Sequence, residues 1–266
     1  MSGVPWWFLI IMLVGVFVVY KFSTNGTYRD IFEFVKAGVP VTIRITLTAY
    51  AFSITIGLFA GLGRVSKNPI IYNIATLYVQ VMRGIPILVT ILYVAFVIIP
   101  PAITAINNLG DWLVGLNILS DANSMSTLSI RQVDFSVRGI VALAISYGAF
   151  SAEIFRAGIE SIGRGQMEAA RSLGMSYVQA MRYIILPQAV RRVLPPLGND
   201  FIAMLKESSL VSMLGVREIT QLSKLYASSS FLYMQTYSLL AVMYLTMTVL
   251  LSLGVKAMER RLSTDG

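Results

Sequence analysis

Long apolar runs separated by short polar stretches dominate the hydropathy pattern of this chain. Residues 4–20 and 45–63 are uncharged and mostly apolar, and no charged side chain occurs between residues 225 and 255. A helix needs roughly 20 apolar residues to cross a bilayer core of about 30 Å. We therefore expect spans at 4–20, at 45–63 and from about residue 234. A cleaved signal peptide is the alternative for the first run, but no Lys or Arg precedes it.

The next apolar stretch, residues 70–100, is too long for one straight crossing, and Pro86 falls inside the excess. We expect residues 70–82 to begin at one membrane interface and a kink at Pro86 to lead into the span proper. Residues 101–136, which are rich in Asn, Gly, Ser and Thr, are expected to form an outer loop that could include a short amphipathic helix at 109–119.

Two further spans carry charges. The run at about 137–157 places Glu153 within or at the edge of the membrane, and the run at about 193–213 is the most polar span of all. An ionisable side chain in a bilayer costs about 2.5–3.5 kcal/mol or more unless it faces a bundle interior or an aqueous cavity, so each is a candidate for a functional site. The charged residues that interrupt the second run are Asp200, Lys206 and Glu207.

A polar, basic stretch at 165–196 lies between these two spans and predicts two short helices. Gly174 is the flexible residue at which the first helix is expected to end. Ser176, followed three residues later by Gln179, fits a capping box that begins the second helix. Pro187 is expected to stop that helix.

The composition indicates an all-α polytopic membrane protein. The 266 residues are 56% hydrophobic and 13% charged, whereas soluble domains are about 25% charged. The chain has no cysteine and no histidine, which removes thiol chemistry, the usual general base and the usual metal ligand. It also lacks a Walker A sequence, so we expect no catalytic residue, no metal and no cofactor. The net charge of +8 is spread between the apolar runs, which argues against nucleic acid as a partner.

Basic residues indicate the orientation of the chain. Six Lys or Arg residues lie in the loop 156–192 and three, Lys256, Arg260 and Arg261, lie near the C-terminus. Because cytoplasmic loops carry an excess of basic residues, we expect the loop and the C-terminus on the cytoplasmic side.

Several residues of this loop reproduce the spacing of a known motif. These residues are Glu168, Ala169, Ala170, Gly174, Ile184, Leu186 and Pro187. Their spacing resembles that of the EAA loop in membrane subunits of ATP-binding-cassette (ABC) importers. The segments that flank the loop, and the stretch YVQVMRGIPILV at 78–89, resemble the polar amino acid permease branch of that superfamily. Three residues depart from the pattern of that branch. Gly163 stands where the branch usually has a proline, Asp200 where it has an uncharged polar residue, and Glu207 where an aspartate is common.

The resemblance covers about residues 39–258 and implies a type I ABC importer permease fold with five core transmembrane helices, preceded here by one N-terminal transmembrane helix. It implies a permease domain at 39–258 that contains the cytoplasmic coupling loop 156–192, an N-terminal anchor and outer linker at 1–38, and a cytoplasmic tail at 259–266. We expect residues 1–38 to be dispensable for transport, because they lie outside the resemblance.

The resemblance also implies a setting and partners. The protein would lie in a bacterial-type plasma (inner) membrane as a multi-pass subunit that moves an amino acid across the lipid bilayer. Its partners would be ABC ATPase subunits, a second permease subunit that is identical or paralogous, and an extracytoplasmic substrate-binding protein. ATP hydrolysis would belong to the partner, not to this chain.

The resemblance implies that the EAA residues contact the ATPase. A polar amino acid carries an ammonium and a carboxylate, and candidates for its path are Glu153, Asn199 and Asp200. Candidates for structural or gating roles are Arg83, Pro86, Lys206 and Glu207. For each ionisable residue taken singly, a purely structural role competes equally with substrate contact, because Glu153 lies three residues from Arg156 and Lys206 could pair with Glu207.

Two functions of other classes stay open. An intramembrane enzyme could use Glu153 and Asp200 as a carboxylate pair, although the chain offers little supporting chemistry. A scaffold without transport would leave the buried charges unexplained. Copurification with an ATPase would distinguish the permease from both.

Overall fold

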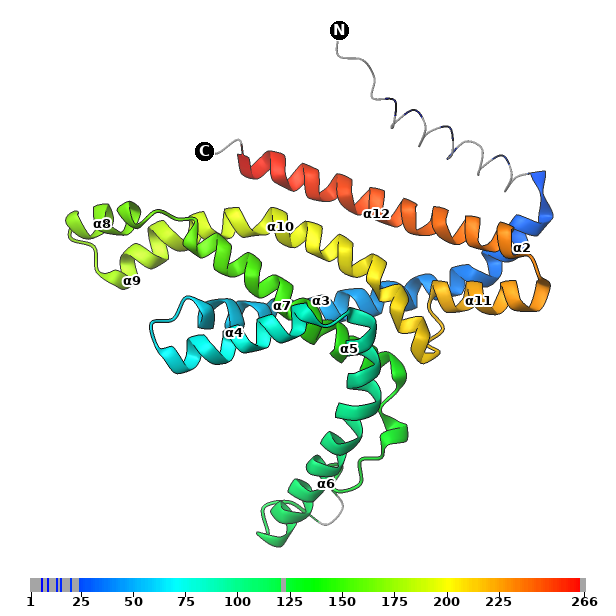
Figure 1. Cartoon of the computed structure of the whole chain (residues 1–266), viewed down its shortest axis with the longest axis horizontal. Coiled ribbons are helices and arrows are strands. Elements are labelled where there is room, and N and C mark those ends of the chain that lie inside the picture. The colour runs from blue at the N-terminus through cyan, green and yellow to red at the C-terminus, as the bar shows by residue number, and fades with distance from the viewer. Residues whose placement is uncertain are drawn as a thin grey trace.

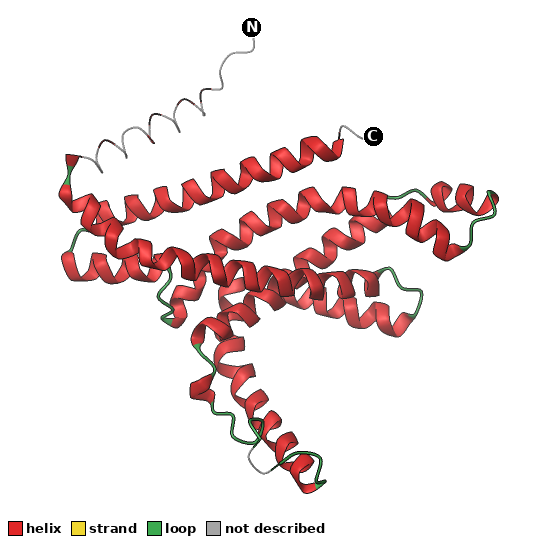
Figure 2. Ribbon diagram, turned by 180° about the vertical axis from the view of Figure 1, so that it is seen from behind, coloured by secondary structure: helices red, strands yellow, loops and turns green. Residues whose placement is uncertain are grey.

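The computed structural model describes residues 25–120 and 123–263, together with positions 6, 9, 13, 15, 20 and 24. Every element within the ranges 25–120 and 123–263 is a helix (Figure 2). The span expected at 4–20 falls largely outside the described residues.

Four long helices form the body of the molecule (Figure 1). They are α3 (Val39–Arg64), α7 (Phe135–Glu160), α10 (Leu186–Glu207) and α12 (Tyr233–Ser263). The expected spans at 45–63, at 137–157 and from residue 234 lie within α3, α7 and α12, so those predictions are confirmed.

Helices α3 and α7 form the most extensive helix pair in the described chain, and glycines make their close approach possible. A Cβ atom at Gly57 would lie 2.5 Å from the Ser151 Cβ, and one at Gly61 would lie 2.8 Å from the Phe155 Cβ. Side chains at these two positions would push the helices apart, because real Cβ contacts are longer. The α3 and α7 backbones are therefore held together as a rigid pair.

The bend predicted at Pro86 is confirmed. Helix α4 (Pro69–Gly84) ends at Ile85, whose backbone is extended, and α5 (Ile87–Tyr93) begins directly after Pro86. The extended conformation is the one that a following proline favours.

The prediction of a loop at 101–136 is wrong over the first half of that range. A π-helical turn, η2 (Val94–Ile98), leads into α6 (Ile99–Gly115), which projects from the bundle in Figure 1. Pro100 and Pro101 lie in the first turn of α6, where a missing N–H costs little. The prolines therefore begin a helix instead of ending one, and the connection is confined to 116–134, which includes η3 (Ile130–Gln132).

The segment expected to be a polar outer linker contains a packed helix. Helix α2 (Gly26–Val35) continues through η1 (Lys36–Gly38) into α3. It lies against α11 (Ile219–Ser230) and α12, and its Ile31 and Val35 are buried in a cluster with Ile219, Leu239 and Met243.

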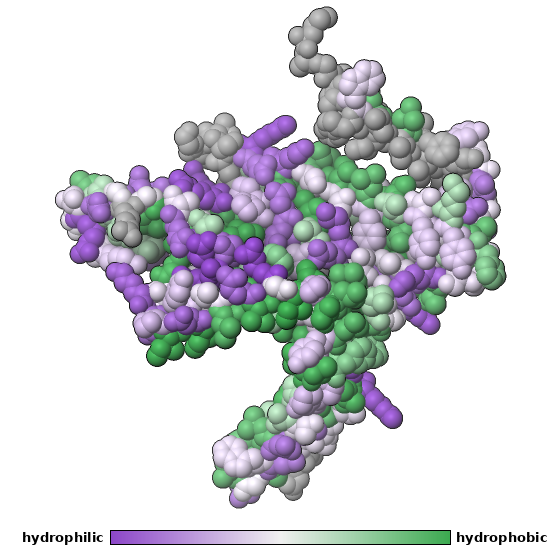
Figure 3. All heavy atoms as spheres, in the orientation of Figure 1, coloured by the Kyte–Doolittle hydropathy of each residue, from purple (hydrophilic) through white to green (hydrophobic). Residues whose placement is uncertain are grey.

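Four helical stretches among the described residues are long and apolar enough to cross a membrane: 26–64, 87–115, 135–160 and 233–261. Helix α10 is not among them, in keeping with its prediction as the most polar span. It nevertheless packs between α7 and α12. Hydrophobic residues cover much of the middle of the molecule in Figure 3, whereas hydrophilic residues gather near the end that carries α8 and α9.

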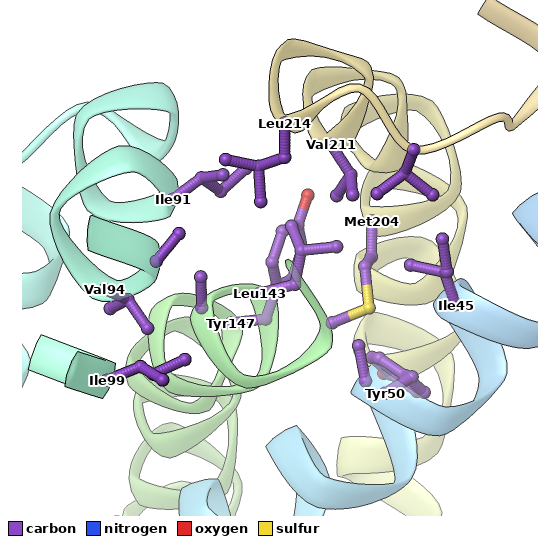
Figure 4. Packing of buried hydrophobic residues seen from close by; sticks show 14 of the residues in the cluster. Ile45, Tyr50, Ile91, Val94, Ile99, Leu143, Tyr147, Met204, Val211 and Leu214 are labelled. Carbon is purple, nitrogen blue, oxygen red and sulfur yellow. The ribbon is translucent and has the colours of Figure 1, made fainter. Parts of the chain in front are cut away.

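The main core joins α3, α7 and α10 to α5 and the η2 turn that follows it. Figure 4 shows Ile91 and Val94 facing Leu143 and Tyr147 of α7, with Met204 of α10 behind them. The 3₁₀ segment η5 (Ser208–Leu214), which follows α10, adds Val211 and Leu214 to the same cluster.

Candidate functional site

Most of the EAA residues lie in a helical hairpin at one end of the bundle, which we call the coupling hairpin (residues 164–185), and Leu186 and Pro187 follow it at the start of α10. It consists of α8 (Arg164–Ser172), α9 (Tyr177–Ala180) and the π-helical turn η4 (Met181–Ile185). Gly174 has φ +83°, the left-handed conformation that favours glycine, and ends α8 as predicted. The predicted capping box is also confirmed, because Ser176 and Gln179 exchange side-chain and backbone hydrogen bonds.

The prediction that Pro187 stops the second helix is wrong. Helix α9 continues through η4 into α10, and Pro187 lies in the first turn of α10. The π turn widens the helix just before the proline, so the proline ring and its missing N–H are accommodated. The coupling hairpin is thereby a continuous extension of α10.

One side of the coupling hairpin packs on the bundle, and the other side is open. Ala170 is buried, and Met167 packs against a cluster of Ile162, Ile185 and Ala189. The tip, by contrast, exposes large apolar side chains: Leu173 is 84% exposed and Val178 is 70% exposed. The other motif residues are exposed or half-buried: Glu168, Ala169, Ile184, Leu186 and Pro187.

Glu153 lies at the centre of an ion cluster near the same end of the bundle. It forms ion pairs with Arg64 of α3 and with Arg156 of its own helix, and Arg83 of α4 approaches its Oε2 to 3.9 Å. Arg156 also pairs with Glu160. The cluster therefore ties α3, α4 and α7 together, and Arg83 lies at its edge.

Asp200 lies in a second polar site, in the interior between α3, α7 and α10. Its carboxylate accepts a hydrogen bond of 3.0 Å from the Ser151 hydroxyl of α7. Glu207 lies two turns further along α10, and the Tyr147 side chain of α7 lies near both carboxylates. The Tyr50 hydroxyl of α3 donates to the Leu197 carbonyl, and its ring packs on Phe201 at 5.0 Å between centroids. We call this set of side chains the α10 polar site.

The structure brings together only some of the predicted path residues. Asp200 and Glu207 share the α10 polar site, whereas Glu153 belongs to the arginine cluster and not to a carboxylate pair with Asp200. Asn199 and Lys206 are exposed, and Lys206 forms no ion pair with Glu207 or with any other described residue.

Sequence reasoning missed Ser151, which donates to Asp200, and the neighbouring Tyr50 and Tyr147. One signal was present. Tyr147 and Ser151 are four residues apart in the expected span at 137–157, so they lie on one face of that helix.

Comparisons with known proteins identify the family of the chain. The family described as "Binding-protein-dependent transport system inner membrane component" matches residues 53–264. The probable amino-acid permease protein YxeN of Bacillus subtilis is 34% identical over 85% of this chain and 89% of its own length. The glutamine transport system permease protein GlnP of Escherichia coli is 32% identical over 85% of this chain and 91% of its own.

Solved structures show the same fold. A crystal structure of an amino acid ABC transporter with histidines aligns with a TM-score of 0.70 at 34% identity, over 90% of this chain and 98% of that chain. An inward-facing structure of the MetNI methionine ABC transporter aligns with a TM-score of 0.61 at 18% identity, over 87% of this chain and 97% of that chain, and supports the fold alone. The chain belongs to the family of inner membrane components of binding-protein-dependent transport systems.

Proposed function

We propose that the chain is the translocation subunit of an ATP-driven amino acid uptake system and that its coupling hairpin receives a separate ATPase. The open tip of the hairpin carries this proposal. Leu173 and Val178 expose apolar surface at the tip of an element that projects at the end of the bundle, and such surface is typical of a site that a partner covers. The names of the relatives, which include permeases for amino acids and for glutamine, support the class of substrate.

The hairpin is also built to transmit movement. It runs without a break through η4 into α10, the helix that carries Asp200. A displacement of the hairpin would therefore reach the α10 polar site through one continuous helix. Coupling of this kind requires that the ATPase contact the hairpin differently in two states.

In this proposal the coupling hairpin and the C-terminus lie in the cytoplasm, and the end that carries α2 and α11 faces outward. The basic residues of the loop 156–192 support this orientation. The location is a bacterial-type inner membrane, and the further partners are a second permease subunit and an extracytoplasmic binding protein. Much of α12 is uncovered, and the second permease subunit could contact it.

For the substrate path, the geometry supports Asp200 better than Glu153. Asp200 has only a hydroxyl partner in the described chain and lies among tyrosines, so its charge is available to a cationic group. Glu153 is already neutralised by arginines from two helices. We assign Asp200 to substrate contact and Glu153 to holding α3, α4 and α7 in register.

For the domain bounds, we propose that the transport core begins at α2 and not at residue 39. The buried side chains of Ile31 and Val35 support the earlier start.

Gly174→Val tests the function of the hairpin. A Cβ atom at residue 174 would meet nothing within 4 Å, so the effect would come from backbone strain alone. A β-branched residue in the left-handed conformation costs roughly 1–2 kcal/mol, whereas Asn tolerates it. We expect Gly174→Val to insert normally but to lose substrate-stimulated ATP hydrolysis, and Gly174→Asn to keep it. Normal coupling in the valine variant would contradict the proposal.

A further inference from the structure

A cavity of about 390 Å³ opens at the end of the bundle opposite the coupling hairpin. Three separate parts of the chain line it: the start of α3 with Val41 and Arg44, the start of α7 with Asp134, and the turn after η5 with Arg217. We call it the outer cavity. None of its lining residues belongs to the α10 polar site.

The charge of the outer cavity is positive. Arg44 and Arg217 are both exposed, and neither guanidinium has a hydrogen bond or ion pair within the described chain. Asp134 supplies the opposite charge, but its Oδ1 already accepts a 2.7 Å hydrogen bond from the Ser136 N–H and caps α7. This hydrogen bonding is the main reason that the pKa of Asp134 is lowered, and it keeps the carboxylate ionised. Two guanidiniums against one occupied carboxylate leave the cavity with an unmatched positive charge.

A carboxylate fits this lining. A guanidinium presents its N–H groups in a planar fork that binds both oxygens of a carboxylate, and two of them on different elements can hold one carboxylate between them. The position of the cavity adds a consequence. The elements that meet there are the outer ends of α3 and α7 and the segment that follows α10, and these three helices carry Tyr50, Ser151 and Asp200. A ligand bound across the cavity would bring together the outer ends of the helices that carry the α10 polar site.

We infer that the outer cavity receives an acidic side chain of the extracytoplasmic binding protein, so that docking clamps α3, α7 and η5 at their outer ends. This inference rests on the proposed function, which supplies the orientation and the partner. A protein side chain is favoured over a free amino acid because two guanidiniums and one carboxylate give the lining a net positive charge, which attracts a lone carboxylate and repels the ammonium of an amino acid.

The test uses the complex of permease and ATPase in nanodiscs of neutral phosphatidylcholine. The probe is the binding protein that stimulates ATP hydrolysis by the wild-type complex, and biolayer interferometry measures its affinity. The variant is Arg44→Gln/Arg217→Gln. The control is Arg131→Gln, because Arg131 of η3 is also exposed and lies outside the lining of the cavity.

We expect the double variant to bind about tenfold more weakly or worse, with a shallower dependence on salt, and the control to bind within about twofold of the wild type. ATP hydrolysis without the binding protein should not change. Equal losses in the variant and the control would show general charge attraction and would overturn the inference, as would unchanged affinity in the variant.

Two further results would also overturn it by naming another occupant. If millimolar free amino acid blocked docking to the wild type only, the occupant would be an amino acid. If the weaker binding of the variant appeared only with anionic lipid, the occupant would be a lipid headgroup. A wild-type complex that no binding protein stimulates would instead refute the proposed function, so the two failures can be told apart.

Discussion

Asp200 is the side chain whose charge the transport path is proposed to use, and Asp200→Asn removes that charge at nearly constant size. The amide can still accept a hydrogen bond from Ser151, which now donates 3.0 Å to the carboxylate. Packing around residue 200 should therefore persist, and the main loss is electrostatic. We expect the variant to assemble with its partners.

The expected size of the effect follows from Coulomb's law. A cationic group about 5 Å from a carboxylate, at an effective dielectric constant of about 20, gains roughly 3 kcal/mol, or a factor of about a hundred. Water in the path and the dipole of the amide reduce this loss, so at least about tenfold should remain for basic amino acids. Acidic amino acids should lose least, because the same charge repels their side chains.

The assay is uptake of radiolabelled amino acids into proteoliposomes at saturating binding protein. Ser151→Ala serves as the matched control, because it removes the hydrogen bond to Asp200 and keeps the charge. It should affect basic and acidic amino acids alike. Equal losses for all substrates in Asp200→Asn, or no loss at all, would refute substrate contact and leave Asp200 as a structural residue.

Two other predictions concern the outer end. Removal of residues 1–24 should keep uptake. Removal of 1–38 should lower the thermal stability of the purified complex, because burial of Ile31 and Val35 contributes about 1.5–3 kcal/mol each. Equal stability of the two truncations would contradict a core that begins at α2. Glu218 is fully buried, and burial raises the pKa of its carboxyl. The folded state therefore keeps this proton to a higher pH than the unfolded state does. As a result, the free energy of unfolding falls as the pH rises from the unfolded-state pKa to the folded-state pKa. Glu218→Gln should therefore raise the melting temperature at neutral pH and match the wild type in acid, and a difference that persists in acid would show that the charge is not the cause.

The spans could be predicted where hydropathy alone decides. Helices α3 and α12 follow uncharged runs of sufficient length, α7 follows a shorter apolar run that ends at Glu153, and the motif spacing predicted the hairpin and its turn at Gly174. Pro100 and Pro187 misled the prediction for one shared reason. Each follows a π-helical turn, and no composition or period in the sequence signals such a turn.

The surroundings of the charged residues could not be predicted, because they depend on contacts between helices. Ser151 reaches Asp200 because α7 is held close to α3, and Gly57 permits that approach. The ion pair of Glu153 with Arg64 joins residues 89 positions apart. Periodicity identifies a face of a helix and does not identify its partner.

The central claim is that the coupling hairpin binds an ATPase, and site-directed cross-linking tests it most directly. The chain has no cysteine, so Leu173→Cys at the exposed tip introduces a single thiol into the permease. Leu116→Cys, in the connection after α6, provides an exposed thiol away from the hairpin. With a short bifunctional thiol-to-amine reagent, residue 173 should cross-link to the ATPase subunit, with a yield that changes when ATP is bound, and residue 116 should not. No cross-link from residue 173 in an assembled, ATP-hydrolysing complex would contradict the account.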